Sequence, residues 1–245
     1  MSGPDDGPVP TAPPRPFSIR PIVSESVRTF RRDWRALLVL AALIEVPLVL
    51  AEVVLHATPS LRGIVEDDSF VGIVALLTVY GSLSHHFLAG LLERVVGAER
   101  HGHERPTVHA VIRHLPWHRL VVADVVLTLL IVVGLGLLVV PGILVATWFA
   151  LALPLINLEN RRVFDAFGRS ARLVRGHAWR VGTIAVGAFL VPEAAVATAS
   201  LLHTGNVVLD AVVHAIPATV LLPLAALPIV IATFDLVALD GAESG

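Results

Sequence analysis

The sequence predicts an all-α integral membrane protein, a bundle of six transmembrane helices with amphipathic interfacial helices on its cytoplasmic side. Of its 245 residues, 55% are hydrophobic and only 16% are charged, and its mean hydropathy is +0.78. Soluble domains carry about 25% charged residues. This chain therefore has too few charges to cover a water-facing surface, whereas a bilayer accepts its apolar excess. The absence of cysteine excludes disulfides and thiolate chemistry.

The first predicted element is a disordered tail over residues 1–16. Six prolines among small and acidic residues oppose helix formation there and offer little to bury. No charged segment followed by a short apolar region and a cleavage site is present, so the mature chain is expected to begin at or near Met1. We expect the membrane domain to cover residues 17–240 and a short tail to follow over 241–245.

Six apolar stretches within this domain are long enough to cross the hydrocarbon core, which takes roughly 17–25 helical residues. They lack the alternating polarity of barrel strands, so helices are expected. The third and fourth spans are joined only by a turn at Val140, Pro141 and Gly142, and three prolines predict kinks in the sixth. The predicted spans are Ala36–Leu55, Phe70–Leu92, Leu120–Val139, Gly142–Leu158, Val181–Leu202 and Ala215–Leu236.

Arginine predicts the orientation, because the chain contains no lysine. All but one of the 18 arginines lie before the first span, between the second and third, or between the fourth and fifth. The exception is Arg62, in a loop that also holds three acidic residues. The positive-inside rule therefore places both termini in the cytoplasm of a multi-pass plasma-membrane protein. Anionic lipid headgroups at the cytoplasmic face are the expected partner of this arginine belt; nucleic acid is not expected.

Each cytoplasmic segment also shows apolar residues at helical spacing, with arginines on the opposite face. We expect short interfacial helices before spans one, three and five, with their apolar faces toward the acyl chains. Each is predicted to end at a tryptophan with a nearby arginine, as in Trp34-Arg35, Trp117 with Arg119, and Trp179-Arg180, which are typical interfacial anchors. The apolar positions are Ile19, Ile22, Val23, Val27, Phe30 and Trp34; Val108, Val111, Ile112 and Leu115; and Val163, Phe164, Phe167, Ala171, Val174 and Ala178.

Four ionisable residues fall well inside predicted spans: Glu45, His85, His86 and Glu193. A charge at mid-bilayer costs roughly 2.5–3.5 kcal/mol on insertion scales. Two interpretations remain open. The residues form a proton or cation path, or the acids are neutral and hold the bundle together through hydrogen bonds between helices. Asp124 and Asp235, about one turn inside the cytoplasmic boundary, are expected to pair with the arginine belt.

The sequence gives no indication of an enzyme, a cofactor or a metal site. It contains no phosphate-binding loop, no GxSxG elbow and no HExxH motif. Five histidines crowd residues 101–118, but their spacing matches no established zinc site, and Pro116 interrupts the helix that would align them. Ser170 has no adjacent base and is expected on the polar face of its helix.

Residues 137–181 contain the most specific pattern: a Pro141-Gly142 turn, an aromatic span, and a helix leading into the next span. The pattern comprises Pro141, Gly142, Trp148, Pro154, Glu159, Ala166, Arg169, Ser170, Gly176, Trp179 and Arg180. It resembles the bacterial multi-span family typified by the membrane domain of some glycerophosphoryl diester phosphodiesterases and by related uncharacterised integral membrane proteins. The resemblance implies architecture rather than activity, because the phosphodiesterase chemistry of those proteins belongs to a separate soluble barrel.

Two functions are consistent with these observations. The first is an interaction or scaffold protein whose arginine-rich helices hold the inner leaflet and dock a membrane protein partner or a second copy. The alternative is a small-solute or proton-coupled transporter that uses Glu45, Glu193 and the His85-His86 pair. An intramembrane enzyme lacks a recognisable nucleophile and base.

Overall fold

The computed structural model describes residues 17–58, 88–90, 92–94, 96–97, 100, 116–137, 139–202 and 204–243. Within these ranges the chain is helical and contains no strand. Four helical runs there are long and apolar enough to cross a membrane: Ile19–Ala51, Val140–Leu158, Ala178–Ala199 and Val207–Ala242. They overlap the first, fourth, fifth and sixth predicted spans. The second predicted span lies outside the described residues except at its last turn, and so does the predicted helix over Val108–Leu115.

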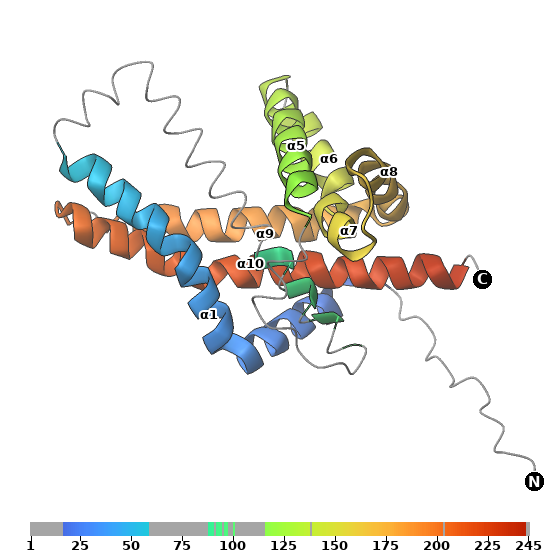
Figure 1. Ribbon diagram of the computed structural model, residues 1–245, viewed down its shortest axis with the longest axis horizontal. Coiled ribbons are helices and arrows are strands. Elements are labelled where there is room, and N and C mark those ends of the chain that lie inside the picture. Colours follow the sequence, from blue (N-terminus) through green and yellow to red (C-terminus); the bar gives the residue numbers. More distant parts are fainter. Residues whose placement is uncertain are drawn as a thin grey trace, which may run out of the picture.

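Helix α1 (Ile19–Ala57) bends at Asp33, whose backbone leaves the helical region (φ −112°, ψ 15°). The bend separates the predicted interfacial segment from the predicted first span and is visible in Figure 1. Before it, Ile22 is 1% exposed, whereas Val23 and Val27 are 46% and 43% exposed. The predicted apolar face is therefore divided, with one edge against the protein and the other open to the surroundings.

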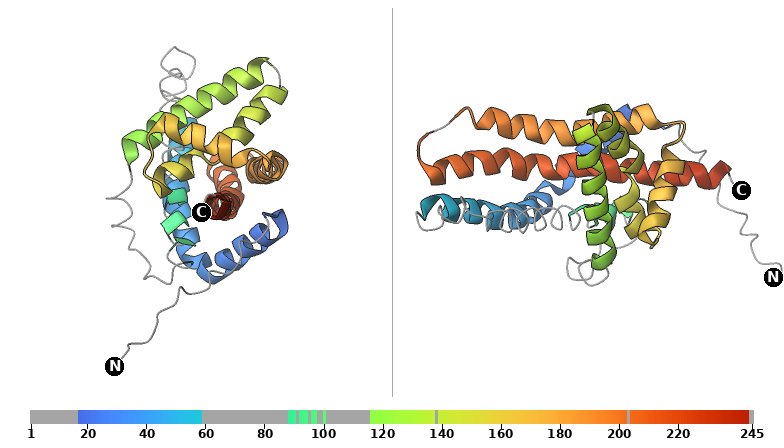
Figure 2. Two further views of the ribbon diagram at one scale, coloured as in Figure 1. Left: turned by 90° about the vertical axis from the view of Figure 1, so that its right-hand side faces the viewer. Right: turned by 90° about the horizontal axis from the view of Figure 1, so that it is seen from above.

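The second half of α1 projects beside α9 (Ala178–Ala199) and the first half of α10 (Val207–Glu243). Figures 1 and 2 show that these three segments extend to the same side of the molecule, and we call them the arm. The connection from α9 to α10 is closed by Asp210, whose Oδ1 accepts hydrogen bonds of 2.7 Å from both the backbone and the hydroxyl of Thr204. Helix α10 continues without a break over its three prolines.

Helices α5 (Trp117–Leu137) and α6 (Val139–Phe149) form a hairpin that runs across α9 and α10 (Figures 1 and 2). The predicted turn at Val140, Pro141 and Gly142 is wrong, because all three residues lie in the first turn of α6. Proline is tolerated there since the first-turn N–H groups have no helical acceptor. A Cβ on Gly134 would lie 2.9 Å from the Cα of Gly142, so the absence of a side chain lets the two helices meet.

The fourth predicted span is interrupted at Ala150 and Leu151, between α6 and α7 (Ala152–Leu158). Pro154 has no N–H to donate to the carbonyl of Ala150, which favours a break at this point. Helix α8 (Val163–Val174) packs against α7 and buries Ala166, Phe167, Ser170, Leu173 and Val174. One prediction is therefore wrong, because Ser170 lies on the buried face of α8 rather than on its polar face. Phe164 is 76% exposed and does not face the protein.

Each of the three tryptophan anchors opens the helix that follows rather than ending the one before, which corrects the sequence prediction. Trp34 follows the bend at Asp33, Trp117 begins α5, and Trp179 is the second residue of α9. Helix α8 ends at Val174, and Gly176 then adopts φ +88°, a left-handed conformation that glycine reaches without strain. Trp179 is 84% exposed; the side chain of Trp117 lies outside the described residues.

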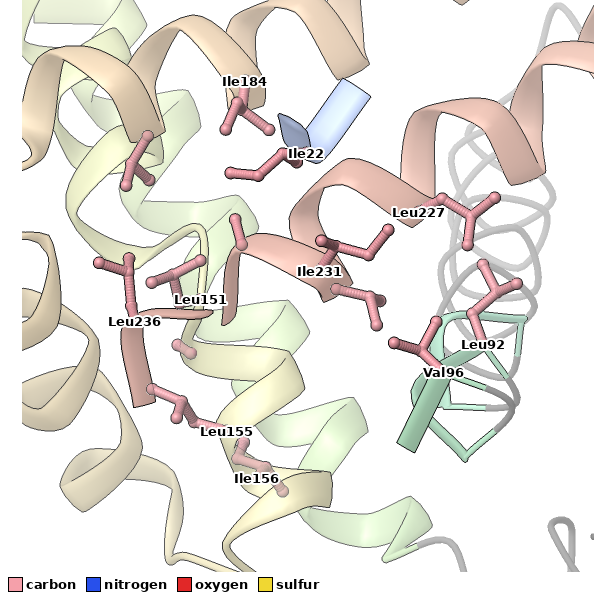
Figure 3. Packing of buried hydrophobic residues seen from close by; sticks show 14 of the residues in the cluster. Ile22, Leu92, Val96, Leu151, Leu155, Ile156, Ile184, Leu227, Ile231 and Leu236 are labelled. Carbon is pink, nitrogen blue, oxygen red and sulfur yellow. The ribbon is translucent and has the colours of Figure 1, made fainter. Parts of the chain in front are cut away.

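The hydrophobic core lies where the second half of α10 meets α7, the base of α9 and the first turns of α1. Figure 3 shows Leu227, Ile231 and Leu236 of α10 with side chains from these neighbours. Leu92 and Val96 approach the same helix from the other side (Figure 3). The second half of α10 is thus the central element of the fold.

Candidate functional site

The structure describes two of the four predicted intramembrane ionisable residues, and it does not bring these two together. Glu45 of α1 is half-buried and lines a pocket of ≈ 360 Å³ between α1 and α10. Glu193 of α9 is exposed and lies outside that pocket. His85 and His86 lie outside the described residues, as does the side chain of Glu52.

The pocket around Glu45 is otherwise apolar apart from Thr219. Leu38, Val46 and Val49 contribute from α1, and Val212 and Ile216 from α10. Glu45 is the one ionisable side chain in this lining. Glu45 is therefore the described residue that best fits the proton-path interpretation.

A second group of charges, the Arg100 cluster (Glu25, Arg100 and Asp235), joins α1 to α10. Arg100 lies 3.0 Å from the carboxylate of Glu25 and 2.8 Å from that of Asp235. Burial alone would lower the pKa of Arg100, but the two carboxylates outweigh it and raise the pKa above its usual value. The expected pairing of Asp235 with the arginine belt is confirmed.

The ring of Phe234 completes this cluster. The guanidinium carbon of Arg100 lies 5.5 Å from the ring centroid, within the range of a cation–π interaction. A Cβ on Gly97 would lie 3.3 Å from the tip of the same ring. The small residue therefore lets the chain that bears Arg100 approach α10 closely.

A third group, the Arg169 cluster (Glu159, Arg161, Arg169 and Asp240), joins the end of α7, α8 and the end of α10. Arg169 lies 2.7 Å from Asp240 and 3.4 Å from Glu159, and Arg161 also pairs with Glu159. Burial would lower the pKa of Arg169, but hydrogen bonding and charge from Asp240 and Glu159 raise it. The sequence pattern singled out Glu159 and Arg169 but gave no indication of Asp240.

Two of the remaining residues of the 137–181 pattern, Pro154 and Ser170, have structural roles in the described geometry. Ser170 is fully buried and donates a hydrogen bond of 2.8 Å to the carbonyl of Trp148, which ties α8 to α6. Pro154 is buried in α7, and Arg119 donates to the side chain of Asn160 at 2.8 Å. Arg180, like Trp179, is exposed.

Sequence reasoning missed Glu93. This side chain is 5% exposed, and neither carboxylate oxygen has a hydrogen-bond partner among the described residues. Burial raises the pKa of Glu93 well above its ordinary value, while the neighbouring Asn157 and Arg94 oppose the rise. Its position at the end of a predicted span, next to an arginine, made it resemble a solvated interfacial acid.

No cluster of three or more histidine, aspartate or glutamate side chains that could hold a metal ion occurs in the described part of the chain. Most of the histidine-rich segment lies outside that part. The fold defines the class: an all-helical protein with four apolar helices compatible with membrane insertion. No family model, curated protein or solved structure matches this chain.

Proposed function

We propose that this chain is an integral protein of the bacterial plasma membrane that acts as a scaffold at the cytoplasmic face. In this proposal it crosses the bilayer six times and keeps both termini inside. The supporting observation is the separation of surface chemistry along the molecule. The Arg100 and Arg169 clusters tie α1, α8 and α10 together at one end, whereas the arm exposes large apolar side chains such as Leu50, Phe189 and Val208.

Arginines that take no part in these clusters support the docking role. Arg28 and Arg31 of α1, Arg172 of α8 and Arg175 after it are exposed, and no ion pair involves them within the described ranges. Paired arginines stabilise the fold, so unpaired exposed ones are available to anionic headgroups or to an acidic surface. The partner is a membrane protein or a second copy of this chain.

The composition and the sequence resemblance support a bacterial source. The chain contains no lysine and is rich in arginine, alanine and valine, as is typical of a G+C-rich genome. The pattern over residues 137–181 resembles the membrane domain of some bacterial glycerophosphoryl diester phosphodiesterases. Neither observation points to an enzymatic activity.

The scaffold proposal is tested by purification in mild detergent, with the mass of the complex as the measurement. We expect the full chain to retain a second copy or a protein partner in fixed ratio. We expect the amount of this complex to fall at least fivefold in a variant with Arg28, Arg31, Arg172 and Arg175 replaced by glutamine, because the docking charges are absent. Replacement of Arg161 by glutamine is the control, since its guanidinium pairs with Glu159 instead.

A transporter is the second candidate, and the Glu45 pocket favours it. Proteoliposomes containing the full chain would then conduct protons, and Glu45→Gln would abolish the flux while Glu193→Gln, at an exposed site, would not. A monomer without a partner that nevertheless shows this flux would overturn the scaffold proposal and support the transporter.

A further inference from the structure

An apolar groove lies between α9 and α10 and is closed at one end by the first turns of α1. Its volume is ≈ 280 Å³. Ile184, Gly187 and Val191 line it from α9, Leu224 and Pro228 from α10, and Val23 from α1. The only polar side chain in its lining is Thr183, whose hydroxyl already donates to the carbonyl of Trp179 at 2.9 Å. The groove therefore offers hydrocarbon contact and no free hydrogen-bonding group of its own.

The depth of the groove matches one leaflet of a bilayer. Its wall on α9 extends from Thr183 to Pro192, a helical rise of about 13 Å. The hydrocarbon core is about 30 Å thick, so one leaflet contributes roughly half of that. Because α9 begins at Ala178, next to the arginine-rich connection from α8, the groove occupies the half of the membrane nearest that end.

A cationic side chain continues the same face of α9 beyond the groove. Residues 180, 184, 187 and 191 follow the spacing of one helical stripe, and the last three line the groove. The first is Arg180, which is exposed and forms no ion pair in the part of the chain that the structure describes. Arg20, also exposed, lies in the sequence between Ile19 and Val23, the two residues of α1 that line the groove. On this stripe Arg180 is the residue that follows the groove toward the end of α9 where the headgroup of a lipid in the groove would lie.

We propose that this groove binds one acyl chain of an anionic phospholipid of the inner leaflet, with the phosphate held by Arg180 and Arg20. An apolar slot one leaflet deep that ends at arginines matches the two parts of such a lipid. The lipid would fill the space between α9 and α10 and join the arm to the interfacial part of α1. This inference rests on the proposed orientation in the membrane and assigns a defined lipid site within it.

Gly187 allows a direct test. A Cβ there would meet nothing within 4 Å, so Gly187→Phe adds a ring to the groove wall with no clash at its Cβ. The purified full chain is mixed in detergent with equal amounts of dioleoylphosphatidylglycerol and dioleoylphosphatidylcholine, and bound lipid is counted by native mass spectrometry. Leu190→Phe is the control for the groove, at an exposed position of α9 that does not line it. Arg161→Gln is the control for Arg180→Gln, because the guanidinium of Arg161 pairs with Glu159.

We expect the wild type to retain one phosphatidylglycerol in preference to phosphatidylcholine. Gly187→Phe should lower this retention at least fivefold, and Arg180→Gln should reduce the preference for the anionic lipid, while the two controls behave as the wild type. Equal retention by Gly187→Phe and wild type, or no retained lipid in the wild type, would overturn the inference. An incorrect orientation would leave these detergent measurements unchanged and would appear only in topology labelling, so the two failures are distinguishable.

Discussion

Replacing Gly134 with leucine is expected to separate α5 from α6 and to destabilise the protein by about 3 kcal/mol, the upper end of the range for overpacking. The reason is that the new Cβ would lie 2.9 Å from the Cα and 3.0 Å from the backbone nitrogen of Gly142. Backbone atoms cannot rotate away as a side chain can, so the hairpin itself must move. Thermal unfolding in detergent, followed by tryptophan fluorescence, measures the loss.

Gly187 provides the matched control, because a Cβ at that position has no neighbour within 4 Å. Gly187→Ala should leave the midpoint temperature unchanged or raise it slightly, since alanine favours helix over glycine. If Gly134→Leu unfolds at the same temperature as the wild type, the close approach of α5 and α6 is incorrect.

Replacing Arg169 with alanine is expected to cost about 2–3 kcal/mol of stability. This is less than the 3–5 kcal/mol for breaking a fully buried pair, because Arg169 and Asp240 remain 13% and 44% exposed. The change removes the guanidinium that lies 2.7 Å from Asp240 and one of the two cations beside Glu159. Chemical denaturation in detergent measures the difference.

The control for this prediction is Arg172→Ala. Arg172 is also an arginine, lies less than one turn from Arg169 in the same helix, and is exposed. It should change the stability by less than about 0.5 kcal/mol. Adding Asp240→Ala to Arg169→Ala should recover part of the loss, because the carboxylate that lost its contact with Arg169 is then absent. A loss that is equal for Arg169 and Arg172 would show that the Arg169 cluster does not stabilise the fold.

Long apolar runs made several helices predictable. The predicted spans that begin at Ala36, Val181 and Ala215 correspond to α1 beyond its bend, α9 and most of α10. The pairing of Asp235 with an arginine was also predictable, because a carboxylate near the cytoplasmic boundary lies within reach of the belt. In both cases the signal is local in sequence.

What the sequence could not predict depends on which neighbours pack together. Helix α8 has apolar residues on more than one side, and only contact with α7 selects the face that contains Ser170 over the one that contains Phe164. The turn between α5 and α6 was misplaced because proline suits both a turn and a first helical turn. Glu93 was missed because the residues next to it in the sequence reveal neither its burial nor its neighbour Asn157, which belongs to α7.

The α5–α6 hairpin is the part on which the six-crossing proposal depends most, because it runs across the arm (Figure 1). In that proposal its tip near Val140, which is 65% exposed, reaches the outer surface. The absence of cysteine in the chain means that a single introduced thiol reports one position only. Labelling of single introduced cysteines can therefore report on the hairpin as well as on the orientation of the arm.

The most direct test of the membrane orientation compares Arg175→Cys with Leu201→Cys, at opposite ends of α9. Both positions are exposed, and the 22 residues of α9 span about 33 Å. With a membrane-impermeant maleimide, we predict that Leu201→Cys reacts in intact cells and that Arg175→Cys reacts only after the membrane is permeabilised. Labelling of Arg175→Cys in intact cells would contradict the account.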